Sequence, residues 1–356
     1  MDESRQPLGS GRDAGPPMVC RRRRPNAGAA AEPTAPPSPS KQSVTRTIDS
    51  LGLRIRTIES EASTGSQAEY FKPEQTILIF DWDDTICPST WIQANRRVLS
   101  FFRPVPNDET YQKPLRELQL HAEAVLQQAM QMGSVVIITN AADPWVEISC
   151  RNFLPKLLPM VSKLPVVYAR SLFYSSLEST IGAAGLGATM PSRRLSAMGT
   201  ASAGRSSSAS PASSSSPGGR HSRAAVAAPG MRQALLAMQQ DEVTPQHWKE
   251  VAFEQEIAGF YSRYSHQSWK NVVSIGDSVF ERDATQQVVM KRPCAKKRCR
   301  AKTVKMFDDP TIEELIAQVR LLDELLGALV KYDGDLNIEI DMGDLQEAGL
   351  LGIAGA

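Results

Sequence analysis

The sequence predicts an α/β fold, a doubly wound and mostly parallel five-stranded sheet with helices on both faces. From about residue 70 onward, short apolar runs alternate with segments in which apolar residues recur every three or four positions. The runs are apolar at almost every position, as expected for strands buried on both faces. Polar and acidic residues follow several of these runs directly, which is typical of ligand-binding edges in parallel sheets.

Five runs are predicted as strands, and three segments between or after them are predicted as helices. The strands are expected at 76–81, 134–139, 164–169, 271–276 and 302–307. The first helix ends at Gly133, the second begins at Asp143 as N-cap with Pro144 behind it, and the third begins with a capping box of Thr311 and Glu314. The apolar stripes of the first and third helices are Leu115, Leu118, Ala122, Val125, Leu126, Ala129 and Met132, and Ile312, Leu315, Ile316, Val319, Leu322 and Leu326.

The remaining segments lack the composition of a packed core. Residues 1–66 are predicted to be mostly disordered, because Pro, Gly, Ala and Ser dominate much of this segment. A Ser-rich stretch, 186–230, is predicted to be a disordered insert within the folded domain, which spans 67–335. Residues 336–356 are expected to form an acidic tail, with one extra strand at 337–340.

Composition excludes several classes of protein. A formal net charge of +1 over 356 residues does not suggest a chain built as a whole for nucleic acid or membrane surfaces. No uncharged apolar run reaches 18 residues and no secretory signal precedes the domain, so we expect an intracellular protein that does not span a membrane. Five scattered cysteines without a CxxC pair support neither a disulfide framework nor a structural zinc site.

Chemistry-bearing residues gather where the predicted strands end. Because parallel strands share one carboxyl edge, residues that follow different strands are expected to meet there. The first strand leads into three acids within four positions, which repel one another unless a cation is near. The residues at this edge are Asp81, Asp83, Asp84, Thr85, Thr139, Asn140, Arg170, Asp277, Ser278 and Glu281.

Four segments, taken in order, resemble the signature motifs of the haloacid dehalogenase superfamily. They are DWDDT (81–85), VIITN (136–140), the lysine of HWKE (247–250) and GDSVFE (276–281). The resemblance covers about residues 70–330 without the insert, and it implies a Mg²⁺-dependent phosphatase that acts through an aspartyl-phosphate. It implies that Asp81, the backbone carbonyl of Asp83 and Asp277 hold the Mg²⁺, with Glu281 close by or ligating through water.

The resemblance also implies a role for each site residue. Asp81 is expected to be the nucleophile, and Asp83 to protonate the leaving group and then activate water. Thr139 and Lys249 are expected to stabilise the transferred phosphate. Lys270 is the alternative to Lys249, although it precedes the fourth strand and so lies at the opposite edge. The expected substrate-binding residues are Trp82, through its backbone amide, Asn140 and Arg170.

The expected substrate is large or exposed, because the chain leaves little room for a folded cap over the site. A phosphoprotein is one candidate, and a nucleic-acid end is another. The basic segment 291–302 is expected to be a solvated loop. Two other interpretations are a loop near the mouth of the site that holds an anionic substrate and, as for Arg21–Arg24, a nuclear import signal, which leaves cytoplasm and nucleus open. Two alternatives stay open, namely a phosphate-binding scaffold with little turnover and phosphotransfer to an acceptor other than water.

Overall fold

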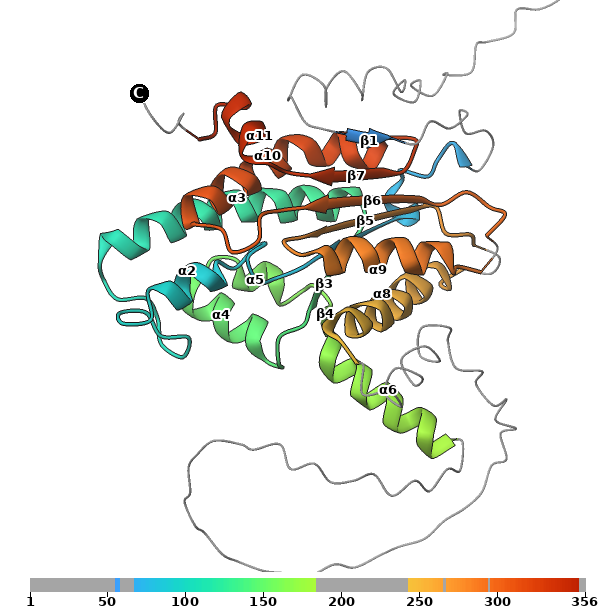
Figure 1. Cartoon of the computed structure of the whole chain (residues 1–356), viewed down its shortest axis with the longest axis horizontal. Coiled ribbons are helices and arrows are strands. Elements are labelled where there is room, and N and C mark those ends of the chain that lie inside the picture. Colours follow the sequence, from blue (N-terminus) through green and yellow to red (C-terminus); the bar gives the residue numbers. More distant parts are fainter. Residues whose placement is uncertain (1–54, 58–66, 184–242, 265–266, 294, 352–356) are drawn as a thin grey trace, which may run out of the picture. The chain divides into compact units, whose positions relative to one another are not determined.

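The computed structural model describes residues 55–57, 67–183, 243–264, 267–293 and 295–351 (Figure 1). The segments predicted to be disordered, 1–66 and 186–230, lie outside the described residues, apart from 55–57. The described helices are α2 (Ser89–Ala94), α3 (Glu109–Met132), α4 (Trp145–Phe153), α5 (Leu158–Val161), α6 (Ala169–Ala183), α8 (Pro245–Tyr261), α9 (Val279–Met290), α10 (Ile312–Lys331) and α11 (Met342–Glu347), with a 3₁₀ turn at Pro73–Gln75.

A seven-stranded sheet lies at the centre of the described residues, so the predicted α/β class is confirmed and the count of five strands is wrong. Its strands are β1 (Ile55–Thr57), β2 (Thr76–Phe80), β3 (Ser134–Thr139), β4 (Val166–Tyr168), β5 (Asn271–Gly276), β6 (Arg300–Lys305) and β7 (Leu336–Glu339). They lie in the order β1-β7-β6-β5-β2-β3-β4. All neighbouring pairs are parallel except β1 with β7, which is antiparallel.

The two additional strands lie at one edge of the sheet. The strand expected at 337–340 forms as β7, and it pairs with β6 rather than extending into solvent. The segment expected as an acidic tail therefore adds to the sheet, because Leu336 and Ile338 are buried against the core. β1 has no apolar run of its own to predict it.

Helices cover both faces of the sheet because successive strand residues point to opposite sides. On one face, Leu78 and Phe80 of β2 pack in a cluster with α3 and α10. On the other face, Ile77 and Ile79 pack with α8 and α9 (Figure 1). The apolar strands are thus buried on both faces of the sheet, as the sequence predicts.

The helices follow most of the predicted pattern. Every predicted apolar residue of α10 is buried, and its Thr311–Glu314 capping box forms. In α3 the stripe is buried except for Met132, which is half-buried, and the helix begins at Glu109, where Asp108 accepts from the Thr110 amide at 2.9 Å. None of the described helices is both long and apolar enough to cross a membrane.

At two helix boundaries the residue that begins or ends the helix acts differently from the prediction. Pro144, not Asp143, occupies the N-cap of α4, so no side chain caps this helix. Gly133 ends α3 in an extended conformation rather than a left-handed one. A side chain at Gly133 would begin 2.6 Å from the Thr76 carbonyl oxygen, so the glycine permits a close approach to β2.

The chain reverses its winding direction at β2, which positions the candidate site. From β2 it adds β3 and β4 on one side, and it later returns to add β5, β6 and β7 on the other side. Ligands bind parallel sheets at the carboxyl ends of strands beside such a switch point. The segments that follow β2, β3 and β5 meet at this point.

Candidate cation and phosphate site

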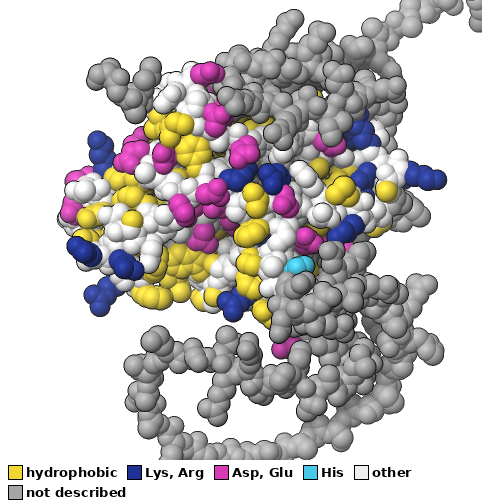
Figure 2. Space-filling view, in the orientation of Figure 1, with side chains coloured by type: hydrophobic (Ala, Val, Ile, Leu, Met, Phe, Trp, Pro, Cys, Tyr) yellow, Lys and Arg dark blue, Asp and Glu magenta, His cyan; other side chains and the backbone are white. Residues whose placement is uncertain are grey.

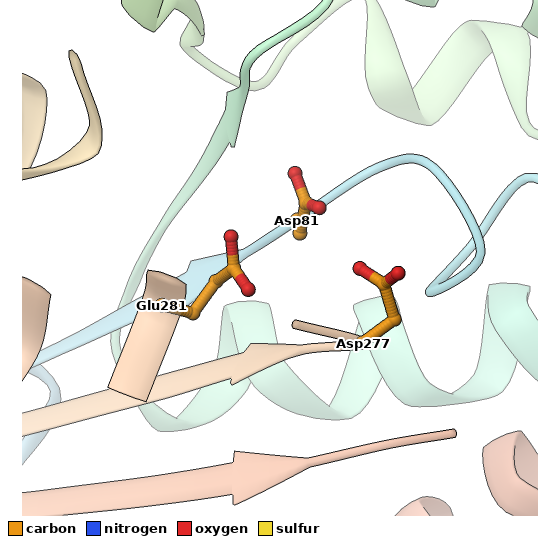
Figure 3. A group of neighbouring side chains, drawn as sticks. All are labelled: Asp81, Asp277 and Glu281. Carbon is orange, nitrogen blue, oxygen red and sulfur yellow. The ribbon is translucent and has the colours of Figure 1, made fainter. Parts of the chain in front are cut away.

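Three carboxyl groups from two segments of the chain form one group at the switch point. Asp81 follows β2, Asp277 follows β5, and Glu281 lies in the first turn of α9. One oxygen from each lies within 4.8 Å of the other two, and Figure 3 shows the three side chains around a common space. We refer to Asp81, Asp277 and Glu281 as the acid group.

Strand pairing brings the acid group together across almost 200 positions of sequence. β2 pairs with β5 in parallel, with Phe80 opposite Ile275, and the Asp81 amide continues the ladder by donating to the Ile275 carbonyl at 2.9 Å. Asp81 and Asp277 therefore leave neighbouring strands at the same edge. Ser278 caps α9 and also donates to Glu281 Oε2 at 2.7 Å, which holds the Glu281 side chain.

Gly276 makes room for Glu281. A Cβ placed on Gly276 would lie 2.5 Å from Glu281 Oε2, a distance too short for any contact between these atoms. The Glu281 side chain thus lies over the backbone where β5 ends. Only glycine allows this position without moving Glu281.

Lys249 of α8 is buried against the acid group. Its ammonium lies 2.7 Å from Asp81 Oδ1, 2.7 Å from Glu281 Oε1 and 2.7 Å from the carbonyl oxygen of Ile138 in β3. Only 1% of the Lys249 side chain is exposed, so water cannot replace these contacts. Lys270, the alternative from sequence, directly precedes β5 and therefore lies at the opposite edge of the sheet.

Burial and mutual repulsion shift the pKa values of the group. Burial raises the pKa of Asp81 to about 7, against the attraction of Lys249 and with a further rise from Glu281. Burial and the charges of Asp81, Glu281 and Asp84 raise the pKa of Asp277 to about 9. For Lys249, burial acts to lower the pKa, but Asp81 and Glu281 outweigh it and raise the pKa overall.

The site therefore holds more negative charge than the neighbouring protein neutralises. Three carboxylates face one ammonium, which leaves two negative charges when all are ionised, the charge that a divalent cation balances. Lys305 at the same edge is paired with Asp308 at 3.0 Å. Carboxylate oxygens suit Mg²⁺, Mn²⁺ and Ca²⁺ alike, so the donor set fits a hard cation without selecting one.

The Asp83 side chain lies outside the acid group. Its Oδ1 accepts from the Trp145 indole at 2.6 Å and from the Ser89 hydroxyl, and its Oδ2 accepts from Thr139 Oγ1 at 3.2 Å. These contacts give the two predicted catalytic acids different surroundings. Asp81 belongs to the acid group, whereas the Asp83 carboxylate is held by neutral donors beside it.

The turn after β2 is held by its own hydrogen bonds. Asp84 adopts a left-handed φ of 49°, is buried, and accepts from the Thr90 amide at 2.9 Å and the Thr90 hydroxyl at 2.7 Å. Burial raises the pKa of Asp84, and the hydrogen bonds from Thr90 oppose that rise. Asp84 thus ties the turn after β2 to the start of α2.

The other predicted site residues lie in different surroundings. The Trp82 indole is fully buried and donates to Ser149 at 2.8 Å, so its ring belongs to the core. Thr139 is buried at the end of β3 and accepts from the Ala141 amide at 3.0 Å, while Asn140 beside it is half-buried. Arg170, near the start of α6, is exposed and lies over the Trp248 ring, 5.3 Å from its centroid.

Sequence reasoning missed Trp145 and Ser89 as partners of Asp83. Trp145 begins α4 shortly after β3 ends, so its place near the carboxyl edge was a usable signal. The signal for Ser89 was weaker, because a serine that starts a helix usually serves that helix.

The interpretation that puts segment 291–302 near the mouth of the site is wrong. This segment leads into β6, so it lies at the amino edge of the parallel sheet, opposite the acid group. Part of its basic character is structural, because Arg298 and Arg300 both pair with Asp333.

Comparison of the chain with protein-family models, with curated proteins and with solved structures found no match.

Proposed function

We propose that this protein is a Mg²⁺-dependent phosphatase of the haloacid dehalogenase type that transfers phosphate to Asp81 and then to water. One observation carries the proposal. Motifs separated by up to about 200 positions, which resemble that superfamily in sequence, supply the acid group and Lys249 at one sheet edge. A solvated acidic turn would not require a buried lysine or a glycine fitted to Glu281.

A divalent cation held by the acid group would neutralise the phosphate and allow a carboxylate to approach it. Within the chain, Asp81 is the nucleophile: its oxygen forms a bond to phosphorus as the bond to the leaving oxygen breaks. Lys249 holds Asp81 in position through its contact with Oδ1 and offsets negative charge on that side. The Thr139 hydroxyl and the amides after β3 bind phosphate oxygens.

Asp83 moves the protons. It gives a proton to the leaving oxygen in the first step and takes one from water in the second, when water attacks phosphorus and the Asp81 carboxylate leaves. The Asp83 carboxylate lies outside the acid group, which supports giving proton transfer to Asp83 and nucleophilic attack to Asp81, because a carboxylate beside a cation would carry a proton poorly.

We propose a phosphorylated substrate that is large or exposed, and a location inside the cell. The described chain between β2 and β3 forms α2, α3 and their connections, and α3 packs on the core rather than over the site. Cys87, Cys150 and Cys299 are free thiols, as is common for proteins of reducing compartments.

The proposal is tested by hydrolysis of a chromogenic aryl phosphate with Mg²⁺ and with a chelator. We expect Mg²⁺-dependent turnover that falls by at least about 10³-fold in Asp81→Asn. Asp283→Asn is the control, because it removes a carboxylate of α9 that pairs with Arg282 outside the acid group. Equal rates for Asp81→Asn and the unaltered protein would remove the nucleophile assignment. Phosphate binding without turnover would instead favour the scaffold function.

A further inference from the structure

A pocket of about 530 Å³ opens beside Asp83. Apolar side chains form most of its lining, among them Phe101, Phe102, Trp145 and Ile148, and its polar lining residues are Asp83, Ser89 and Asp143. Figure 2 shows hydrophobic side chains next to acidic ones over the region of α2 and α4. The pocket therefore joins an apolar wall to the residue proposed to protonate the leaving group.

The aromatic rings in this wall are suited to contact another ring. Phe101 meets Trp145 edge to face, with ring centroids 5.0 Å apart and planes at 90°. Phe102 is 79% exposed, although complete burial of such a side chain contributes about 1.5–3 kcal/mol. A substrate that covers Phe102 would gain part of that free energy.

Trp145 links the pocket to the chemistry through its hydrogen bond to Asp83 Oδ1. An indole N–H can only donate, so this bond holds Asp83 Oδ1 at the apolar wall of the pocket. The Thr139 hydroxyl contacts Oδ2, so the Asp83 carboxylate is held at both of its oxygens.

The position of Asp83 beside the aromatic wall favours a leaving group that carries a ring. A phenol has a pKa of about 10, as in tyrosine, whereas the hydroxyl of serine is far less acidic. Phenolate therefore leaves with less help from an acid than an alkoxide does. The aromatic wall favours a ring next to the reacting phosphate, and the hydrogen bond from Trp145 places Asp83 beside that ring.

The size of the pocket exceeds what one ring requires, since an apolar cavity of about 150 Å³ is enough to bind benzene. The remaining space can hold an apolar group that neighbours the ring in the same substrate. A tyrosyl residue within a peptide has such neighbours, and a free phenyl phosphate does not.

We propose, on the basis of the phosphatase function proposed above, that the Phe101–Phe102–Trp145 pocket binds the ring of a phosphotyrosyl peptide and that Trp145 positions Asp83 for its phenolic leaving group. Asp81 forms the new P–O bond as the bond to the phenolic oxygen breaks. The phenolate leaves with the bonding electrons and takes the proton from Asp83. Water then releases inorganic phosphate, and Asp83 recovers a proton.

The first experiment compares kcat/KM of the full chain with Mg²⁺ on a phosphotyrosyl peptide, the same peptide with phosphoserine, and phenyl phosphate. We expect the phosphotyrosyl peptide to be hydrolysed best and the phosphoseryl peptide least. Phe102→Ala is expected to lower kcat/KM about 10-fold on the phosphotyrosyl peptide and not on the phosphoseryl peptide. Leu120→Ala, which truncates an exposed side chain of α3 outside the pocket, should change neither.

The second experiment tests Trp145 as a positioning residue, with phenyl phosphates whose phenols differ in acidity. Trp145→Phe keeps an aromatic wall and removes the N–H, so Asp83 should protonate the leaving oxygen less well and kcat/KM should depend more steeply on the acidity of the phenol. An equal fall for every substrate would show a structural role only and would overturn the positioning claim.

The outcomes separate this inference from the function on which it rests. Equal rates on the two peptides would overturn the pocket assignment and leave the phosphatase proposal intact. Turnover of phenyl phosphate but of neither peptide would overturn the proposal that the substrate is a phosphotyrosyl peptide. No Mg²⁺-dependent hydrolysis of any probe would overturn the phosphatase proposal itself.

Discussion

The two edges of the parallel sheet both bury charged side chains, but they balance them differently. At the carboxyl edge, Lys249 faces Asp81 and Glu281, and Asp277 completes the acid group. At the amino edge, Arg300 and Lys302 of β6 are fully buried. Burial alone therefore does not distinguish a functional site from a structural one.

At the amino edge, the chain itself supplies the partners of the buried cations. Arg300 donates to Asp333 Oδ1 and to Gln67 Oε1, both at 2.8 Å, and its guanidinium lies 4.0 Å from the centroid of the Tyr70 ring. Lys302 donates to the Val330 carbonyl at 2.8 Å, and burial lowers its pKa well below the usual range. A neutral Lys302 would leave no charge to balance.

At the carboxyl edge, the chain leaves negative charge unbalanced. Burial raises the pKa values of Asp81 and Asp277, so without a cation these two carboxyl groups lose their protons at a higher pH than exposed carboxyl groups do. The contrast teaches that an excess of one charge, rather than buried charge as such, distinguishes the edge proposed to bind a cation.

The largest expected difference in stability is between Lys249→Met and Lys302→Met. Lys249→Met leaves Asp81 and Glu281 buried without their cation, which we expect to cost about 3–5 kcal/mol of unfolding free energy. Lys302→Met should change it by less than about 1 kcal/mol, because Asn271 still donates to the Val330 carbonyl at 3.1 Å. Urea unfolding at neutral pH with a chelator measures both, and similar losses in the two variants would contradict the comparison.

Addition of a divalent cation should stabilise the protein through the carboxyl edge alone. At 100 times its Kd, Mg²⁺ is expected to add about 2.7 kcal/mol to the unfolding free energy. Thermal unfolding with and without Mg²⁺ measures this effect. Lys302→Met should keep the response and Asp277→Asn should lose it, so a full response in Asp277→Asn would show that the cation binds elsewhere.

Without a divalent cation, the acid group should make stability fall as pH rises. The folded pKa values of about 7 for Asp81 and about 9 for Asp277 lie above the value near 3.8 expected in the unfolded chain. The folded protein thus holds protons that the unfolded chain releases, and this stabilisation is lost between about pH 4 and pH 9. Melting temperatures with a chelator should therefore fall with pH more steeply for the unaltered protein than for Asp277→Asn. If the melting temperatures of the two proteins fell in parallel with pH, Asp277 would not have a raised pKa in the folded protein.

The smallest expected effect comes from a pair of glycines. Gly259 in α8 has no atom within 4 Å of an added Cβ, so Gly259→Ala should stabilise the protein by about 0.5–1 kcal/mol. Gly276→Ala should instead displace Glu281 and weaken the stabilisation by Mg²⁺. Thermal unfolding with and without Mg²⁺ distinguishes the two variants. An unchanged stabilisation by Mg²⁺ in Gly276→Ala would show that Glu281 does not contribute to cation binding.

The sequence predicted those parts of the fold that strong periodicity specifies. Buried strands such as β2 and β5, and the stripe and capping box of α10, follow from local pattern. β1 did not, because an antiparallel edge strand is defined by its partner β7 rather than by its own residues. The interpretation that put segment 291–302 near the mouth of the site was wrong, because a segment that leads into a parallel strand lies at the amino edge of the sheet.

For the site, the sequence indicated which backbone ends meet, but not which way each side chain turns. Motif order predicted that Asp81 and Asp277 would lie at one edge, and they do. The orientation of Asp83 depends on Trp145 and Ser89, which no motif included. Glu281 lies within the acid group because Gly276 gives it room, a three-dimensional fit that spacing alone does not reveal.

The central claim is that a phosphoryl group passes through Asp81, and its most direct test is to locate that group on the chain. Asp83→Asn removes the base that activates water, so the intermediate should accumulate with an aryl phosphate and Mg²⁺. After an acid quench and digestion, mass spectrometry should find one phosphoryl group on Asp81, sensitive to hydroxylamine and absent from the Asp81→Asn, Asp83→Asn double variant. A phosphoryl group on another residue, or Mg²⁺-dependent hydrolysis that persists in Asp81→Asn, would contradict the account.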